Sequence, residues 1–199
     1  GGGFNAQGSY EIGYCYYQIK DYKNAIVNFE KATEAKDSLA QNAWYHLADC
    51  HVKNNSKTKA RNAFYAASTT SFDPKITEDA LFSYAKLCYE LSFAPYNDAV
   101  VAFQKYILDY PESPRKAEAY NFLVNVYSTT KNYSQAIVSI EKIQPLDPIL
   151  KITYQKLIYF KAVEFFNNMD LDSSARYFKK SLSVNFDNTY NALSQYWLG

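Results

Sequence analysis

The most regular feature of the chain is a small residue followed, four positions later, by a large apolar one. Ala25 and Phe29 show it within residues 21–32, a segment whose order of apolar and polar positions returns at residues 96–106 and 132–143. The complete set of pairs is Ala25/Phe29, Ala60/Phe64, Ala99/Phe103, Ala136/Ile140 and Ser174/Phe178. Positions four apart lie on one face of an α-helix, so each pair predicts a helix with a buried face.

Another helix is predicted before each helix that carries a small-large pair. A site of mostly small residues precedes every pair, at Gly13, Ala48, Ala85, Val124 and Ala162. Small residues let two helices approach closely, and the large side chain of the pair then fills the space between them. Asp or Pro marks the end of each unit, at Asp37, Asp73-Pro74, Pro111, Pro148 and Asp187, where a helix is expected to stop. Each unit therefore predicts a helix-turn-helix hairpin.

The hairpins recur with a nearly constant period. Their small residues, from Ala25 to Ser174, lie 35, 39, 37 and 38 positions apart. A period of a few tens of residues indicates that hairpins stack into a solenoid, because one hairpin cannot bury its apolar face alone. We expect one continuous array rather than separate domains.

Three units carry the residues of a known repeat. The matches are Trp44, Leu47 and Ala48 with Ala60, Phe64 and Ala67; Ile12, Gly13 and Tyr16 with Ala25, Phe29 and Ala32; and Tyr120, Leu123 and Tyr127 with Ala136 and Pro148. This pattern resembles the tetratricopeptide repeat, a helix-turn-helix of about 34 residues. The resemblance implies an all-α, right-handed superhelical solenoid of antiparallel hairpins. Its repeats would span residues 6–39, 41–74, 78–111, 117–148 and 155–188, with a truncated sixth at 192–199. The fifth departs from the pattern, with Lys161 for Leu and Ser174 for Ala.

Charge and hydropathy narrow the class of partner. The formal net charge is +1, and Lys and Arg are scattered among Asp and Glu, so nucleic acid and anionic membranes are disfavoured. No run of eighteen apolar residues predicts a membrane span. The chain has 20 Tyr and 13 Phe, and these rings must line packing surfaces or a binding face.

The resemblance implies where a partner would bind. In the family, the first helix of each hairpin lines a concave groove, and the corresponding positions here are Tyr10, Tyr14, Tyr17, Tyr45, Asp49, Phe82, Tyr89, Asn121, Asn125, Tyr159 and Phe166. A Tyr side chain offers a large rigid contact with a hydrogen-bonding tip. We therefore expect a non-enzymatic scaffold that binds a protein or peptide segment in an aromatic groove.

Two alternatives concern the same face. Its rings could instead pack against the next first helix and close the face, which would make the chain a structural spacer or a self-association segment.

Chaperone adaptors of the family hold a C-terminal carboxylate through Lys, Asn and Arg side chains at groove positions. Here those positions hold Tyr10, Tyr14, His46, Asp79 and Ser83, so partners of that class are disfavoured.

One cluster suggests chemistry. Asp49, Cys50 and His51 are consecutive, and His46 lies three positions before Asp49. Helical spacing places His51 at an inter-helix packing position and turns His46 and Asp49 toward the groove, where they supply too few ligands for a metal. Cys15, Cys50 and Cys88 lack CxxC spacing, which disfavours a disulfide framework. We expect no cofactor and no metal; an enzyme would have to use Asp49 with His46.

The segment from Phe103 to Tyr120 contains Tyr110-Pro111, then Ser113, before the next hairpin. It is similar to repeats of bacterial cell-envelope proteins, including outer-membrane assembly lipoproteins, and this resemblance implies a periplasmic or cell-envelope location. The glycines at residues 1–3 and the incomplete sixth unit lead us to expect a piece of a longer protein.

Overall fold

The computed structural model describes residues 5–35, 37–91, 97–146 and 148–199. Every element of secondary structure in these ranges is a helix. The chain divides into two compact units, residues 1–111 and 112–199, and each is described by itself below.

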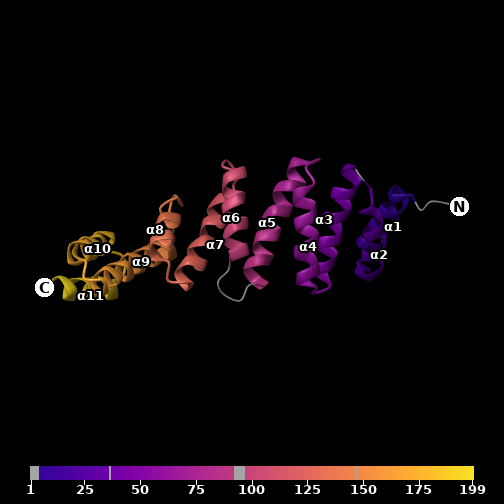
Figure 1. Cartoon of the computed structure of the whole chain (residues 1–199). Helices are drawn as coiled ribbons and strands as arrows, with labels where there is room; N and C mark the ends of the chain where they lie inside the picture. The colour runs from indigo at the N-terminus through magenta and orange to yellow at the C-terminus, as the bar shows by residue number, and fades with distance from the viewer. Residues whose placement is uncertain (1–4, 36, 92–96, 147) are drawn as a thin grey trace. The chain divides into compact units, whose positions relative to one another are not determined.

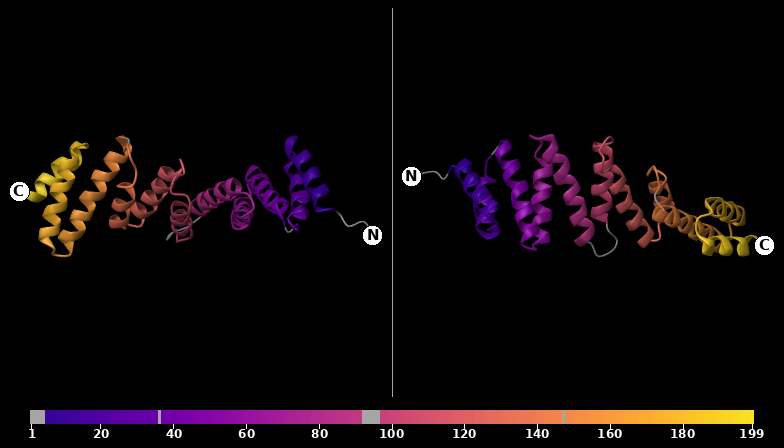
Figure 2. Two further views of the ribbon diagram at one scale, coloured as in Figure 1. Left: turned by 90° about the horizontal axis from the view of Figure 1, so that it is seen from above. Right: turned by 180° about the vertical axis from the view of Figure 1, so that it is seen from behind.

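The first unit contains six helices packed in chain order. They are α1 (Ala6–Gln18), α2 (Tyr22–Ala32), α3 (Ser38–Lys53), α4 (Lys57–Thr69), α5 (Pro74–Leu91) and α6 (Asn97–Asp109). Each helix packs on the next, and α3 also contacts both α1 and α5, as the views in Figures 1 and 2 show. The first helices of successive hairpins therefore lie against one another.

The second unit continues the same plan. It contains α7 (Lys116–Thr129), α8 (Tyr133–Ile140), α9 (Pro148–Asn167), α10 (Leu171–Val184) and α11 (Asn188–Leu198). Consecutive helices again pack together, and α9 also contacts α11. The predicted all-α fold of sequential helical hairpins is confirmed.

Most of the residues that we expected to close a unit lie instead at the start of the next helix, whereas Pro111 follows the end of α6 as expected. Asp37 and Asp187 are the N-caps of α3 and α11, and their side chains accept hydrogen bonds from Leu39 N and Thr189 N. Pro74 is the first residue of α5, as Pro148 is of α9. The missing N–H of proline costs nothing in the first turn, where no helical acceptor exists. These residues separate the units by starting a helix.

The turns inside four of the hairpins are alike. Each has one residue with positive φ directly before the N-cap of the second helix, at Lys20, Asn55, Lys131 and Met169. In each, the N–H of the following N-cap residue donates to a carbonyl of the first helix, as Asp21 N does to Tyr16 O at 2.9 Å. This bond satisfies one of the free carbonyls at the helix end.

Small residues permit the close approach within a hairpin. Gly13 of α1 and Phe29 of α2 are both buried, and a Cβ added at Gly13 would lie 3.0 Å from the Phe29 ring. In the fourth hairpin the two sites are closer in size, because Val124 and Ile140, both buried, occupy them. A larger residue on the first helix thus accompanies a side chain smaller than phenylalanine on the second.

A buried glutamine in the first unit fastens one hairpin to the next. Gln41 of α3 has no exposed surface, and its Oε1 accepts hydrogen bonds from Phe72 N at 3.2 Å and Asp73 N at 2.7 Å. Its Nε2 donates to Ala67 O at 3.1 Å and to Thr77 Oγ1 at 2.9 Å. One side chain thereby holds the turn between α4 and α5 against α3.

The same arrangement occurs in the second unit. Gln155 of α9 is fully buried, and its Oε1 accepts from Phe186 N at 3.0 Å and Asp187 N at 2.7 Å. Its Nε2 donates to Asn191 Oδ1 at 2.8 Å. In both units the glutamine binds the backbone of a Phe-Asp pair that lies 32 positions later, counted to the Asp. The sequence pattern did not indicate this contact.

The close contact at Gly13 predicts a position-dependent effect of a larger side chain. Gly13→Val would push its methyl groups into the Phe29 ring and should lower the free energy of unfolding by about 1–3 kcal/mol. Gly8→Val on the same helix is the matched control, because no atom lies within 4 Å of a Cβ there. Urea unfolding measures both variants, and an equal effect at the two glycines would contradict the packing.

The glutamine contact predicts a second stability effect. Gln41→Leu would leave the partly buried N–H of Asp73 without its acceptor, at a cost of about 1–3 kcal/mol, whereas Phe72 N keeps Thr70 O as an acceptor. The same change at the exposed Gln18 serves as control and should be close to neutral. Chemical denaturation of both variants would test this, and a Gln41→Leu protein as stable as the unmodified chain would refute it.

Candidate functional site

In the first unit, the face that α1 turns toward α3 carries a row of tyrosine rings. Tyr10, Tyr14 and Tyr17 stand at helical spacing, with ring centroids 6.3 Å and 6.2 Å apart along the row and nearly parallel planes. The ring of His46, from α3, meets all three nearly edge-on at 5.5–5.8 Å. Phe29 and Tyr45 complete its surroundings at 5.5 Å and 5.9 Å.

His46 therefore has a packing role that the sequence did not predict. We expected a polar groove pair with Asp49, but five aromatic rings surround the imidazole. Its Nδ1 lies 2.9 Å from the carbonyl oxygen of Asn42, one helical turn earlier. The side chain joins α1, α2 and α3 instead of supplying a free catalytic base.

Tyrosine hydroxyls link successive first helices. Tyr17 of α1 donates a hydrogen bond to Asp49 Oδ2 of α3 at 2.7 Å. Tyr45 of α3 likewise donates to Asp79 Oδ2 of α5. The hydrogen bond to Asp49 raises the pKa of Tyr17 well above its ordinary value, and partial burial adds to the shift. Some of the polar groups expected to face a partner in the groove are thus used to link neighbouring first helices.

The second unit contains a matching group of rings. Trp197 of α11 occupies the place that His46 has in the first unit, with Phe166 and Phe178 at centroid distances of 4.7 Å and 5.8 Å. The indole Nε1 donates to the hydroxyl of Tyr159 at 3.1 Å. A ring on one first helix therefore inserts among rings of the preceding hairpin in both units.

The predicted groove residues differ in exposure. Tyr14 is 41% exposed and Phe166 is 38% exposed, and Asn125 is exposed as well. Phe82 and Tyr159 are only 1% and 8% exposed, so these two rings keep little surface for a partner. The remaining six are partly exposed: Tyr10, Tyr17, Tyr45, Asp49, Tyr89 and Asn121.

Phe82 is buried because its ring faces the second helix of its own hairpin. Its centroid lies 4.9 Å from that of Tyr106 and 6.0 Å from that of Phe103, both on α6. In contrast, Tyr10, Tyr14, Tyr17 and Tyr45 all contact the His46 ring and form one group with it. The structure thus brings together the predicted residues of α1 and α3.

The neighbours of His46 in the sequence do not form a reactive site. Burial, reinforced by the nearby Asp49 carboxylate, raises the pKa of the Cys50 thiol to about 12, so the thiolate is scarce at neutral pH. Burial also lowers the pKa of His51, with Lys59 acting in the same direction and Glu30 against it. Within the described ranges, no group of three or more His, Cys, Asp or Glu side chains could hold a metal ion.

Two family models, both described as tetratricopeptide repeat, match the sequence. One matches residues 6–38 and 117–149, and the other matches residues 79–113, together just over half of the 199 positions. The chain belongs to the tetratricopeptide repeat family. No curated protein matches it in sequence.

Solved structures of tetratricopeptide repeat proteins share the fold. YrrB, described as having an unusual peptide-binding site, aligns with a TM-score of 0.55 at 15% identity, over 96% of this chain and 92% of its own. MamA from Desulfovibrio magneticus RS-1 aligns with a TM-score of 0.55 at 15% identity, over 92% of this chain and 96% of its own. PilF from Pseudomonas aeruginosa aligns with a TM-score of 0.51 at 17% identity, over 95% of this chain and 80% of its own.

Among the described helices of this tetratricopeptide repeat chain, none combines the length and apolar character that crossing a bilayer requires.

The buried His51 predicts acid sensitivity of folding. Its folded-state pKa is lowered, so below about pH 6.5 the unfolded chain takes up a proton more readily than the folded one. The unfolding free energy should therefore fall as the pH drops through 6.5, by at most about 1.4 kcal/mol per pH unit for one group. His51→Leu removes the group, so the stability difference between the two proteins should change between pH 7.5 and 5.5. Denaturant titrations at several pH values measure it, and a pH-independent difference would contradict the prediction.

Proposed function

We propose that the chain is a non-enzymatic scaffold that binds a protein or peptide segment along the inner faces of its first helices. Proteins built from tetratricopeptide repeats generally bind other proteins. The repeats would follow the boundaries predicted from the sequence, from residue 6 to residue 188 with the start of a sixth at 192. The observation that carries the proposal is the partly exposed ring row of α1 beside the carboxylate of Asp49.

The first unit offers both apolar and polar contacts to such a segment. Tyr14 is the exposed member of its row, and it is supported on both sides by Tyr10 and Tyr17. Asp49 is partly exposed, and its Oδ2 is held by Tyr17, whereas its Oδ1 accepts no hydrogen bond from the described residues. A peptide N–H or a cationic side chain could donate to Oδ1. Rings and a carboxylate already fixed in place lose little conformational freedom on binding.

The second unit adds a further contact area of its own. Phe166 is exposed at the inner face of α9, and its ring rests on Trp197. Asn125, an exposed residue of α7, can donate and accept hydrogen bonds. Apolar rings with a few polar groups are typical of sites that recognise a peptide. The peptide-binding site described for YrrB, on a similar fold, agrees with this proposal.

A structural spacer is the second candidate function. The observation that favours it is the set of bonds between first helices, in which Tyr17 reaches Asp49 and Trp197 reaches Tyr159. Together with the buried Phe82, these contacts would give a stiff array whose inner face is partly closed. A spacer would bind no ligand on that face.

Selection from a random linear peptide library would test the scaffold function. Peptides selected on the intact chain should bind it in fluorescence anisotropy with micromolar affinity. Tyr14→Ser should weaken this binding by roughly fivefold or more, since truncating a central interface ring costs above about 1 kcal/mol. Asp49→Asn should weaken the binding of peptides that donate to the carboxylate.

Tyr65→Ser is the matched control, because Tyr65 of α4 is 53% exposed but belongs to a second helix. Circular dichroism establishes that each variant remains helical. Peptides that bind the Tyr14 and Tyr65 variants equally would place the contact elsewhere and contradict the groove. A selection that yields no binding peptide at all would favour the spacer.

A location in the cell envelope remains part of the proposal. Its support is the sequence segment with Tyr110-Pro111 and Ser113, which lies between α6 and α7. Fractionation of cells that produce the tagged full-length protein would test it, and recovery only with cytoplasmic markers would contradict it.

A further inference from the structure

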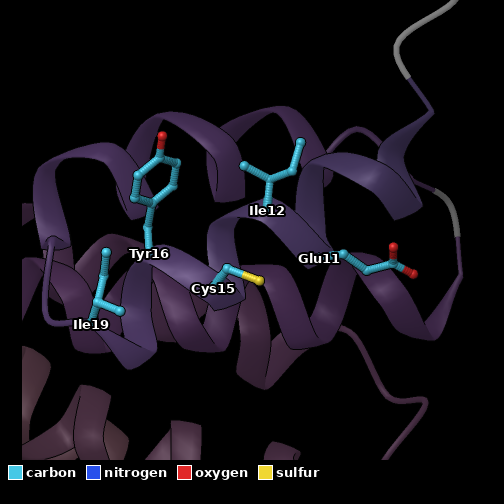
Figure 3. Close-up of a pocket in the computed structure, with 5 residues that line it drawn as sticks. All are labelled: Glu11, Ile12, Cys15, Tyr16 and Ile19. Carbon is cyan, nitrogen blue, oxygen red and sulfur yellow. The ribbon is translucent and has the colours of Figure 1, made fainter.

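One face of α1 stays largely uncovered by the described residues of the first unit. It carries Ile12, Cys15 and Ile19, all exposed, with Ile19 at 72% and Ile12 at 43%. With Glu11 and the partly buried Tyr16, these residues line a depression of about 500 Å³ on the surface of the helix (Figure 3). We call these five residues the α1 patch. Contiguous exposed apolar side chains of this kind usually mark a contact surface.

The corresponding residues of the next hairpin show what such a face accommodates. Leu47, Cys50 and His51 of α3 occupy the repeat positions of Ile12, Cys15 and Tyr16, and all three are buried in a unit where α2 packs on α3. In this array the face therefore accepts a helix. An occupant of the α1 patch should be a helix with an apolar stripe of similar width.

The sequence of α1 is complementary to itself when reversed. In an antiparallel pair of α1 helices centred between Cys15 and Tyr16, residue i faces the residue whose number is 31 − i. Ile12 then faces Ile19 of the other copy, and Cys15 faces Tyr16, so every apolar residue of the patch meets another. We propose that the α1 patch is a twofold contact between two copies of this chain. An isologous interface of this kind needs one surface that complements itself.

Charge supports the antiparallel orientation. The antiparallel orientation brings Glu11, at one end of the patch, toward the end of the second copy's helix, where Lys20 follows the C-cap of α1, and both residues are exposed. Gln7 Nε2 donates to Glu11 Oε1 at 2.8 Å within one chain, which holds the carboxylate at the rim of the patch. A parallel pair would set Glu11 against Glu11. Opposite charges at a rim select orientation more than they add affinity.

The contact is small, and the expected affinity follows from its size. A single helical stripe buries less area than the roughly 1,200–2,000 Å² of a standard stable interface. We therefore expect a weak, concentration-dependent dimer with a dissociation constant on the order of 100 μM. The contact lies on a different face of α1 from Tyr14, so it is compatible with the proposed peptide binding.

Cys15 makes the contact directly measurable. It is the exposed one of the three free cysteines, whereas Cys50 and Cys88 are buried. In the proposed register the two Cys15 thiols lie on either side of the twofold axis, so a short bis-maleimide should join two chains. Sedimentation equilibrium of the whole chain gives the dimer fraction without any reagent. Cys15→Ser should abolish the cross-link.

Ile19→Ser tests the patch against a matched control. It should lower the dimer fraction at least fivefold, whereas Ile149→Ser, at a residue of α9 that is 74% exposed, should leave it unchanged. Glu11→Lys and Lys20→Glu should each weaken the dimer, and combining them should restore it, because the charges are then exchanged. Circular dichroism and urea unfolding of every variant show that folding is retained.

A chain that stays monomeric up to millimolar concentration would overturn the proposal. So would a dimer that Ile19→Ser leaves intact, or a double charge variant that is no better than the single ones. Peptide binding measured on the same variants keeps the two proposals separate. For Ile19→Ser we expect loss of the dimer, while peptide binding still depends on Tyr14 as in the unmodified chain. This result would agree with both proposals.

Discussion

The structure depends on how closely two helices of one hairpin can approach. Gly13 lies against the Phe29 ring at a distance that leaves no room for a further methyl group. Where Val124 replaces the small residue, Ile140 replaces the ring, so the gain in volume at one site is partly offset by a loss at the other. Interiors packed at this density tolerate volume-conserving exchange far better than a net gain or loss.

Contacts between hairpins include, besides aromatic packing, a set that is polar and directional. A buried glutamine, Gln41 or Gln155, accepts two backbone hydrogen bonds from the turn that leads to the next hairpin. Tyr17 and Trp197 add hydrogen bonds between neighbouring first helices. Apolar contact alone would let packed helices slide, whereas hydrogen bonds of fixed geometry define one register. A rigid inner face suits both a binding scaffold and a spacer, and exposure at Tyr14 favours the former.

Much of the fold was predictable from residue type and spacing. The alternation of small and large residues indicated hairpins, and the structure has them within both units. Most of the residues that mark the unit boundaries were recognised but assigned to the wrong side, since Pro148 begins α9 and Asp187 caps α11, whereas Pro111 follows α6 as predicted. Both residues interrupt a helical pattern, and the pattern alone does not tell whether they end one helix or start another.

The sequence by itself determined which residues share a helix face, because that depends only on the 3.6-residue period. It therefore identified the row of Tyr10, Tyr14 and Tyr17 as one face of α1. Only the tertiary structure decided how exposed each ring is, since exposure depends on neighbours far away in the chain. Tyr14 stays exposed, whereas Phe82 is buried by rings of α6. The enclosure of His46 arises in the same way, from three helices that meet only after folding.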